Sequence, residues 1–116
     1  MNRQAAERRG REGEAQAAAW LRERGWHILA ERVRTPAGEV DLIARRENMI
    51  AFVEVKTRAR AAELDFAIDM PRLARVAAAA EILAATYAGP GDDIRIDVLL
   101  LAPGRPPRHI ENAWHG

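Results

Sequence analysis

Cysteine is absent from this chain of 116 residues, which excludes disulfides, thiolate metal sites and a cysteine nucleophile. The chain also lacks any stretch close to the roughly 20 apolar residues that span a bilayer. No apolar run follows the basic N-terminal segment to make a secretory signal. These absences predict a cytoplasmic protein of a reducing compartment that does not associate with membranes.

Large apolar side chains are scarce as well. Hydrophobic residues make up 48% of the sequence, but 24 positions are alanine. The remaining apolar side chains suffice for one compact core, so we expect a single domain over residues 1–116. The net charge of +1 neither requires nor excludes an anionic partner.

The small number of lysines is the most informative feature of the composition. The sequence has 18 Lys and Arg residues, and Lys56 is the one lysine among them. Lysine can lose its proton at accessible pH, whereas arginine stays protonated. The position of Lys56 therefore needs a chemical explanation.

Periodicity and turn residues predict the order helix, three strands, helix, and one or two strands. The first helix is expected from about Gln4 to Arg24, with Gly25 as its C-terminal stop. A loop from Arg58 to Asp69 follows the third strand, and Pro71 suits the first turn of the second helix. The other expected ranges are 26–33, 39–44 and 49–56 for the strands, 71–88 for the second helix, 94–101 for the next strand and 109–114 for a short edge strand.

Polar side chains interrupt one face of the third expected strand. Glu54 and Lys56 are two residues apart and so project from the same face. In a hairpin centred on residues 47 and 48, positions whose numbers sum to 95 lie opposite, which pairs Asp41 with Glu54 and Glu39 with Lys56. Two facing carboxylates repel each other, so we expect something to offset the repulsion between Asp41 and Glu54.

A hard divalent cation would offset that repulsion. Mg²⁺ binds oxygen ligands at about 2.0–2.1 Å, commonly from one or two carboxylates together with water and substrate phosphate. Lys56 would then position an attacking water or help to remove its proton, a role that arginine cannot fill. The residues therefore predict a Mg²⁺ or Mn²⁺ site.

Asp41 followed by Glu54-Val55-Lys56 on the next strand resembles the PD-(D/E)xK signature of restriction-endonuclease-like proteins, whose core is commonly αβββαβ. Further strings extend the likeness over nearly the whole chain, which is similar to the bacterial YraN-type family, an uncharacterised group that resembles Holliday-junction resolvases. Where that family commonly has a lysine near the start of the second helix, this chain has Arg72 and Arg75. The strings are Gly10-x-x-Gly13-Glu14-x-x-Ala17, Gly38-Glu39-Val40-Asp41-Leu42-Ile43-Ala44, Phe52-Val53-Glu54-Val55-Lys56-Thr57-Arg58 and Arg95-Ile96-Asp97-Val98.

The resemblance implies a restriction-endonuclease-like α/β fold, with a mixed central sheet flanked by helices, and a metal-dependent endonuclease acting on structured or branched DNA. By this likeness Asp41, Glu54 and the carbonyl of Val55 hold the metal. Lys56 attends the attacking water, and Glu14 reaches the catalytic cluster from the first helix. Glu39 belongs to the motif without an assigned role.

Basic residues near these motifs are candidates for contacts with DNA phosphates, because backbone charge dominates nucleic-acid affinity. They are Arg11, Arg58, Arg60 and Arg72.

Other interpretations remain open. The third strand would equally suit a solvated sheet face with a cross-strand ion pair, and Glu14 an acid that complements the helix dipole. The alternative functions are a non-cleaving nucleic-acid-binding module and a protein-interaction adaptor on a nuclease-like scaffold. The oligomeric state is also open, a homodimer included. The histidines lack ligand spacing and are expected to be structural or surface residues: His27, His109 and His115.

Overall fold

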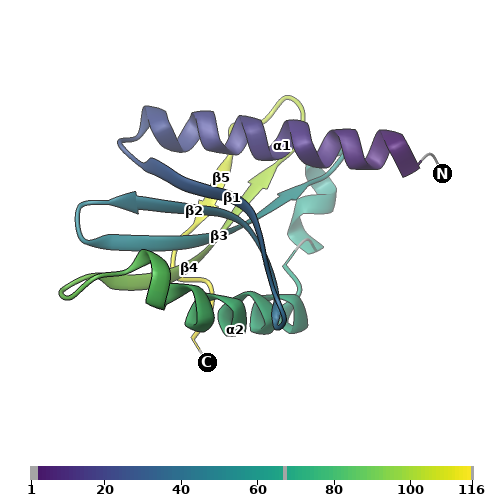
Figure 1. The fold of residues 1–116 in the computed structure, drawn as a ribbon. Coiled ribbons are helices and arrows are strands. Elements are labelled where there is room, and N and C mark those ends of the chain that lie inside the picture. The colour runs from purple at the N-terminus through teal and green to yellow at the C-terminus, as the bar shows by residue number, and fades with distance from the viewer. Residues whose placement is uncertain (1–2, 67, 116) are drawn as a thin grey trace.

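The computed structural model describes the backbone of residues 3–66 and 68–115 and the side chains of residues 10–63 and 68–115. Five strands form one mixed sheet in the order β1-β2-β3-β4-β5, with β3 and β4 parallel and the other neighbours antiparallel. The predicted αβββαβ order is confirmed (Figure 1). The elements are α1 (Arg3–Glu23), β1 (His27–Thr35), β2 (Gly38–Arg46), β3 (Met49–Thr57), the 3₁₀ helix η1 (Ala61–Phe66), α2 (Met70–Tyr87), β4 (Asp93–Leu101) and β5 (Arg108–Ile110).

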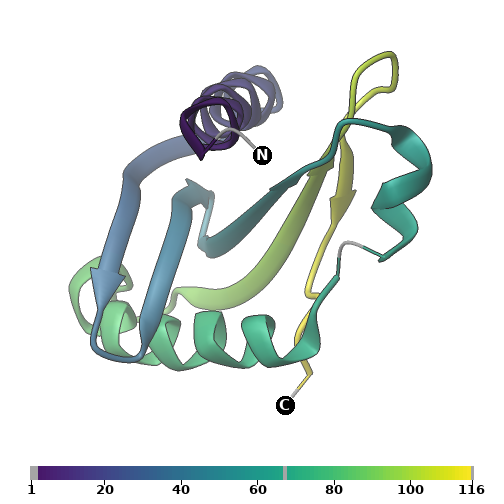
Figure 2. The same ribbon diagram turned by 90° about the vertical axis from the view of Figure 1, so that its right-hand side faces the viewer.

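The helices cover opposite faces of the sheet, as Figures 1 and 2 show. On one face, α1 packs Ala17, Ala18 and Leu21 against strand residues such as Leu42 and Val53. The other face forms the larger core beneath α2. Its helical side chains are Leu73, Val76, Ala79, Ala80 and Leu83. No helix in the described part of the chain has the apolar length that a bilayer span requires.

Local capping signals explain where the helices end. Gly25 has φ of 89° and donates its N–H to Arg22, while Trp26 donates to Leu21, which is the hydrogen-bond pattern of a Schellman motif. Asp69 caps α2 by accepting a hydrogen bond from the Arg72 amide, at 3.2 Å. The predicted stop at Gly25 is therefore confirmed.

The β2–β3 hairpin has the predicted register, but its ladder is shorter than predicted. Paired residues run from Arg46–Met49 to Leu42–Val53, and each pair of numbers sums to 95. The predicted pairs of Asp41 with Glu54 and Glu39 with Lys56 lie beyond that ladder. β3 instead continues along β4, and β2 continues along β1. The two strands therefore part at Asp41.

Two other expectations need correction. The segment from Arg58 to Asp69 is not all loop, because η1 occupies Ala61–Phe66. The last strand ends at Ile110 rather than at 114. A turn at Asn112, with φ of 52°, follows it, and the Asn112 amide bonds to a buried carboxylate instead of a strand neighbour.

Gly13 lets α1 approach β3 closely. A Cβ atom at this position would overlap the Cγ2 methyl of Thr57 and lie 3.7 Å from Leu101. Glu14 is the next residue of the helix, and Lys56 precedes Thr57. The close approach therefore sets how near the helix carries Glu14 to the sheet.

Replacing Gly13 by alanine is expected to lower the free energy of unfolding by about 1–3 kcal/mol, because α1 or Thr57 must move. Gly10→Ala is the matched control, since no described atom lies within 4 Å of the added methyl. It should raise stability by up to about 1 kcal/mol through helix propensity. Thr57→Ser should recover part of the loss in the double variant. Urea unfolding measures all four proteins, and equal stability of the two alanine variants would contradict the packing argument.

Candidate functional site

The candidate site begins where β2 leaves β3. Asp41, which is 8% exposed, accepts a hydrogen bond from the Val55 amide through Oδ2, at 2.8 Å. The side chain of Asp41 thereby takes the place of a backbone partner for β3. The N–H and C=O groups of a strand residue point to the same neighbouring strand, so the Val55 carbonyl also faces the Asp41 side.

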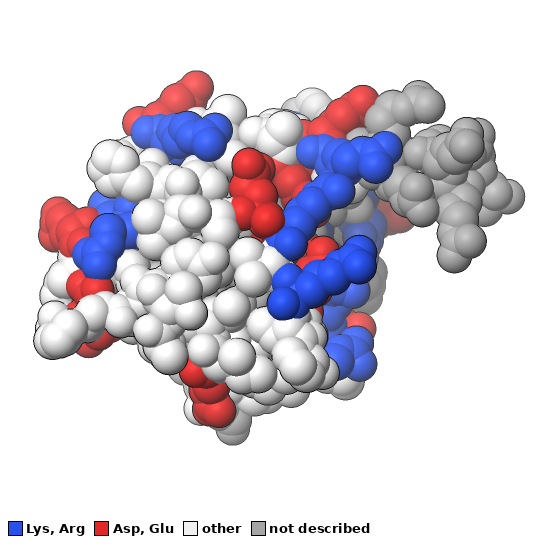
Figure 3. All heavy atoms as spheres, in the orientation of Figure 1, with Lys and Arg blue, Asp and Glu red and all other residues white. Residues whose placement is uncertain are grey.

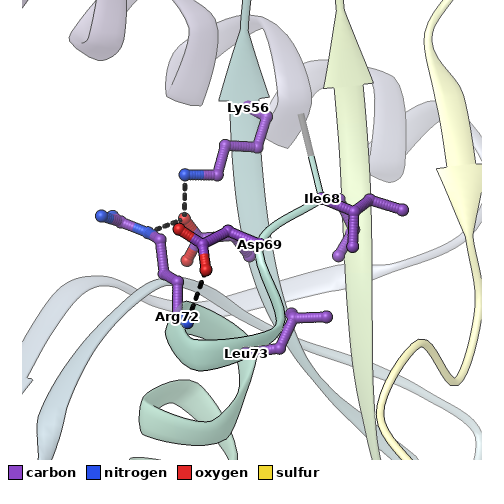
Figure 4. Close-up of a pocket in the computed structure, with 7 residues that line it drawn as sticks. Lys56, Ile68, Asp69, Arg72 and Leu73 are labelled. Carbon is purple, nitrogen blue, oxygen red and sulfur yellow. Dashed lines mark hydrogen bonds and ion pairs between the residues drawn. The ribbon is translucent and has the colours of Figure 1, made fainter. Parts of the chain in front are cut away.

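Glu54 is buried beside Asp41 and is only partly neutralised. The residue is 1% exposed, and its Oε1 lies 2.5 Å from Arg72 Nε and 3.4 Å from Lys56 Nζ. Figure 4 shows the two cations converging on this carboxylate from β3 and α2. The other oxygen, Oε2, is buried without a hydrogen-bond partner among the described residues. Leaving a charged acceptor unsatisfied in the interior is costly.

The environment of Asp41 disfavours its charge. Burial, followed by repulsion from Glu54, raises the pKa of Asp41 from 3.8 to about 7. The hydrogen bond from Val55 opposes the shift, and Glu14 adds to it. Repulsion between the two carboxylates therefore disfavours the charge of Asp41, and such repulsion was expected from their strand positions.

Glu14 reaches the same region but has its own partner. Its Oε2 lies 2.6 Å from Nε of Arg32, a contact that sequence reasoning missed. Arg32 has φ of 52° in β1, which is rare for a residue with a side chain. Glu39 is exposed, and its Oε2 lies 3.7 Å from Nε of Arg34. No three His, Cys, Asp or Glu side chains among the described residues are arranged to share a metal ion, so Glu14 does not complete such a cluster.

The residues at the point where β2 and β3 part nevertheless fit a hard cation with few protein ligands. Mg²⁺ commonly takes one or two carboxylates and completes its coordination with water and substrate phosphate. Asp41 supplies a carboxylate whose charge is disfavoured, and Glu54 supplies an oxygen that has no partner within the described part of the chain. The carbonyl of Val55 faces the same side. A positive ion at this point would relieve both the repulsion and the unsatisfied acceptor.

A family model described as "Uncharacterised protein family UPF0102" matches residues 13–101. The chain belongs to this family. UPF0102 proteins of Erythrobacter litoralis and Sphingopyxis alaskensis are 65% and 62% identical over 114 residues, which cover 98% of this chain and 98% of each relative. A UPF0102 protein of Caulobacter vibrioides is 44% identical over 113 residues, or 97% of this chain and 90% of the relative. The predicted family is confirmed, and its description assigns no activity.

The arginines predicted to contact DNA have different surroundings in this UPF0102 chain. Arg11 is exposed on α1, and Arg60 is exposed shortly after β3. The amide of Arg58 donates to Leu101, and its guanidinium donates to the Thr57 carbonyl. Arg72 instead contacts Glu54, so it is part of the candidate site itself.

A second buried charge cluster lies on the α1 side of the sheet. Asp97 is fully buried and accepts two hydrogen bonds from Arg95, one from His109 and one from the Asn112 amide. Burial alone would raise the pKa of Asp97, but these partners outweigh it and lower the pKa below the ordinary value. His109 has the predicted structural role. The Arg95-x-Asp97 spacing could have indicated an ion pair, because both side chains share one strand face.

Substituting Asp41 by asparagine is expected to stabilise this UPF0102 protein at pH 8 by about 2–4 kcal/mol, since one pKa unit corresponds to about 1.4 kcal/mol. The folded protein binds the Asp41 proton more tightly than the unfolded chain. Its stability therefore falls as pH rises from about 4 to 7. Asparagine cannot ionise but still accepts the Val55 amide. Urea unfolding at pH 4 and pH 8 should show the gain growing with pH, and a loss of stability at pH 8 would contradict the repulsion.

The same substitution at Asp97 is expected to have the opposite effect. Asp97→Asn should destabilise the protein at pH 7 by about 3 kcal/mol, because breaking a buried ion pair leaves Arg95 with only the exposed Glu111 as an acidic partner among the described residues. The lowered pKa means that this stabilisation is lost as pH falls through the folded value. The difference from wild type should therefore shrink at pH 3. Denaturation midpoints at both pH values test this, and a neutral substitution at pH 7 would refute it.

Proposed function

We propose that this protein is a Mg²⁺- or Mn²⁺-dependent endonuclease of the PD-(D/E)xK type that hydrolyses phosphodiester bonds of DNA. The observation that carries the proposal is the pairing of two buried acids beside the chain's single lysine. The pKa of Asp41 is raised to about 7, and one oxygen of Glu54 has no partner among the residues that the structure describes. Stability alone does not account for such a pair, because buried polar groups are normally satisfied.

Asp41, Glu54 and the Val55 carbonyl would hold the divalent cation. When bound, it would neutralise charge on the phosphoryl group and make water a better nucleophile. Asp41 is held in place by the Val55 amide, and Glu54 by Arg72 and Lys56. Asp41 is therefore oriented before a cation arrives, which reduces the reorganisation needed at that carboxylate.

Lys56 would act on the attacking water. Its side chain is 15% exposed, and its Nζ lies 3.4 Å from Glu54 Oε1, so the amine remains next to the acid pair. A neutral amine there could accept the proton that water loses as it attacks phosphorus, with the leaving oxygen departing on the opposite side. Arginine at position 56 would keep the charge but not this proton chemistry.

Surface charge favours a nucleic-acid substrate. In Figure 3, basic side chains gather on the side of the molecule toward which β3 runs in Figure 1, next to an acidic group. Arg11, Arg58 and Arg60 are the candidates for phosphate contacts from α1 and from the segment after β3. A structured or branched DNA is the substrate expected from the likeness to Holliday-junction resolvases.

A non-cleaving nucleic-acid-binding module is the second candidate. Two specific ion pairs favour it, because Glu14 pairs with Arg32 and Glu54 pairs with Arg72. Such a module needs no metal, and its affinity would depend on salt through the exposed arginines. Binding without cleavage would leave Lys56 dispensable.

Cleavage of linear, nicked and four-way DNA in Mg²⁺ or Mn²⁺ tests the proposal. Wild type is expected to cut at least one substrate, and Lys56→Ala should slow cutting by about 10²–10⁴-fold, the range for a lost general base. Lys56→Arg is the matched control for charge and should be nearly as slow. Asp41→Asn should also be inactive.

Equal cutting by wild type and all variants would reject the assignment, because the activity would belong to a contaminant. Absence of cutting by wild type, with salt-sensitive DNA binding that survives Lys56→Ala, would favour the binding module. Absence of binding even at low salt, together with a specific protein partner, would favour an adaptor.

A further inference from the structure

Arg72 occupies an unusual position for a cation. It lies in the first turn of α2, where the helix dipole disfavours positive charge, and that turn has no acidic residue. Its amide is fixed by Asp69, and its guanidinium reaches from α2 to Glu54 on β3. The contact with Glu54 therefore gives this arginine its main electrostatic compensation.

We propose that Arg72 is a substrate-binding residue with two alternative partners. It pairs with Glu54 until a divalent cation replaces it there, and it then binds a phosphate of the DNA. This inference rests on the metal site of the proposed function. It adds a competition between the chain's own cation and the divalent ion for one carboxylate.

Arg72 and a divalent cation would compete for the charge of Glu54. Arg72 Nε lies 2.5 Å from Oε1, and Lys56 Nζ is 3.4 Å from the same atom. The pocket around Glu54, which Arg72, Lys56, Ile68 and Leu73 help to line, is too tight to admit a water molecule. A divalent ion at Oε2, which has no partner among the described residues, would share one carboxylate with the guanidinium on Oε1, so the two positive charges would repel each other.

Arg72 can leave without unfolding α2. Its side chain is 44% exposed, whereas that of Glu54 is 2% exposed, so the guanidinium lies between the acid and solvent. The cap at Asp69 uses the backbone of Arg72 and does not depend on the position of the guanidinium. Once released, a guanidinium at this opening is suited to bidentate contact with a phosphate.

Calorimetric titration with Mn²⁺, without DNA, measures the competition directly. Arg72→Ala and Arg72→Gln should bind Mn²⁺ at least about tenfold more tightly than wild type, since one charge-assisted hydrogen bond no longer has to be broken. Arg75→Ala is the matched control, because it removes the same charge one turn further along α2, where the residue is exposed. Its affinity should change by less than about threefold, as expected for a screened charge. Circular dichroism verifies that each variant is folded, and Arg72→Lys should stay near wild type.

DNA binding in EDTA and in Ca²⁺, a second oxygen-ligated ion, tests the release. In EDTA, Arg72→Ala should change DNA affinity less than it does in Ca²⁺, because Glu54 holds the arginine when no divalent cation is bound. In Ca²⁺, Arg72→Ala should weaken DNA binding and reduce the slope of log affinity against log salt concentration by about one.

Two results would overturn the inference. One is an Arg72 variant that binds Mn²⁺ no more tightly than Arg75→Ala, and the other is the absence of Mn²⁺ binding in every protein. Tighter Mn²⁺ binding by Arg72→Ala, together with a wild type that cuts no DNA, would reject the nuclease and keep the competition. Cutting by wild type, with unchanged Mn²⁺ affinity in the Arg72 variants, would support the nuclease and reject the competition.

Discussion

The hydrogen bond from the Val55 amide to Asp41 determines the arrangement of the site. It forms where β2 stops pairing with β3, so it satisfies a backbone donor that would otherwise lose its partner. The bond also draws the Asp41 carboxylate toward the strand that carries Glu54. One interaction thus ends the hairpin ladder and holds two acids together in a region from which water is largely excluded. The raised pKa of Asp41 follows from that placement, since burial and the neighbouring acid both act against its charge.

The two buried acid clusters show how the same residue types can produce opposite electrostatics. Around Asp97, donors from β4, β5 and the following turn satisfy both carboxylate oxygens, and the pKa is lowered. Where β2 and β3 part, Glu54 has cations on one oxygen, and its other oxygen has no partner in the described part of the structure. The difference is not one of burial, because both residues are almost inaccessible. It lies in the number of donors, and the deficit at Glu54 is what an added cation would supply.

The element order and hairpin register were predictable because they depend on local periodicity and on the turn at residues 47 and 48. The proximity of Asp41 to Glu54 followed from the register, although the ladder ends at Leu42–Val53, before both predicted pairs. The end itself could not be predicted, because a side chain replaces a backbone partner there. The contacts of Arg32 with Glu14 and of Arg72 with Glu54 depend on a left-handed residue in β1 and on where α2 packs. Neither leaves a periodic signal in the sequence.

Lys56 differs chemically from Arg72, the other cation beside Glu54. Glu54 already has an arginine close to Oε1, so a second permanent cation would add little to the stability of the acid pair. Lys56 is the farther of the two cations and projects from the same strand face as Glu54. In a chain whose other 17 basic residues are arginine, the site has at this point the basic side chain that can exchange a proton. Neutralising Glu54 does not require that property, whereas the proposed activation of water does.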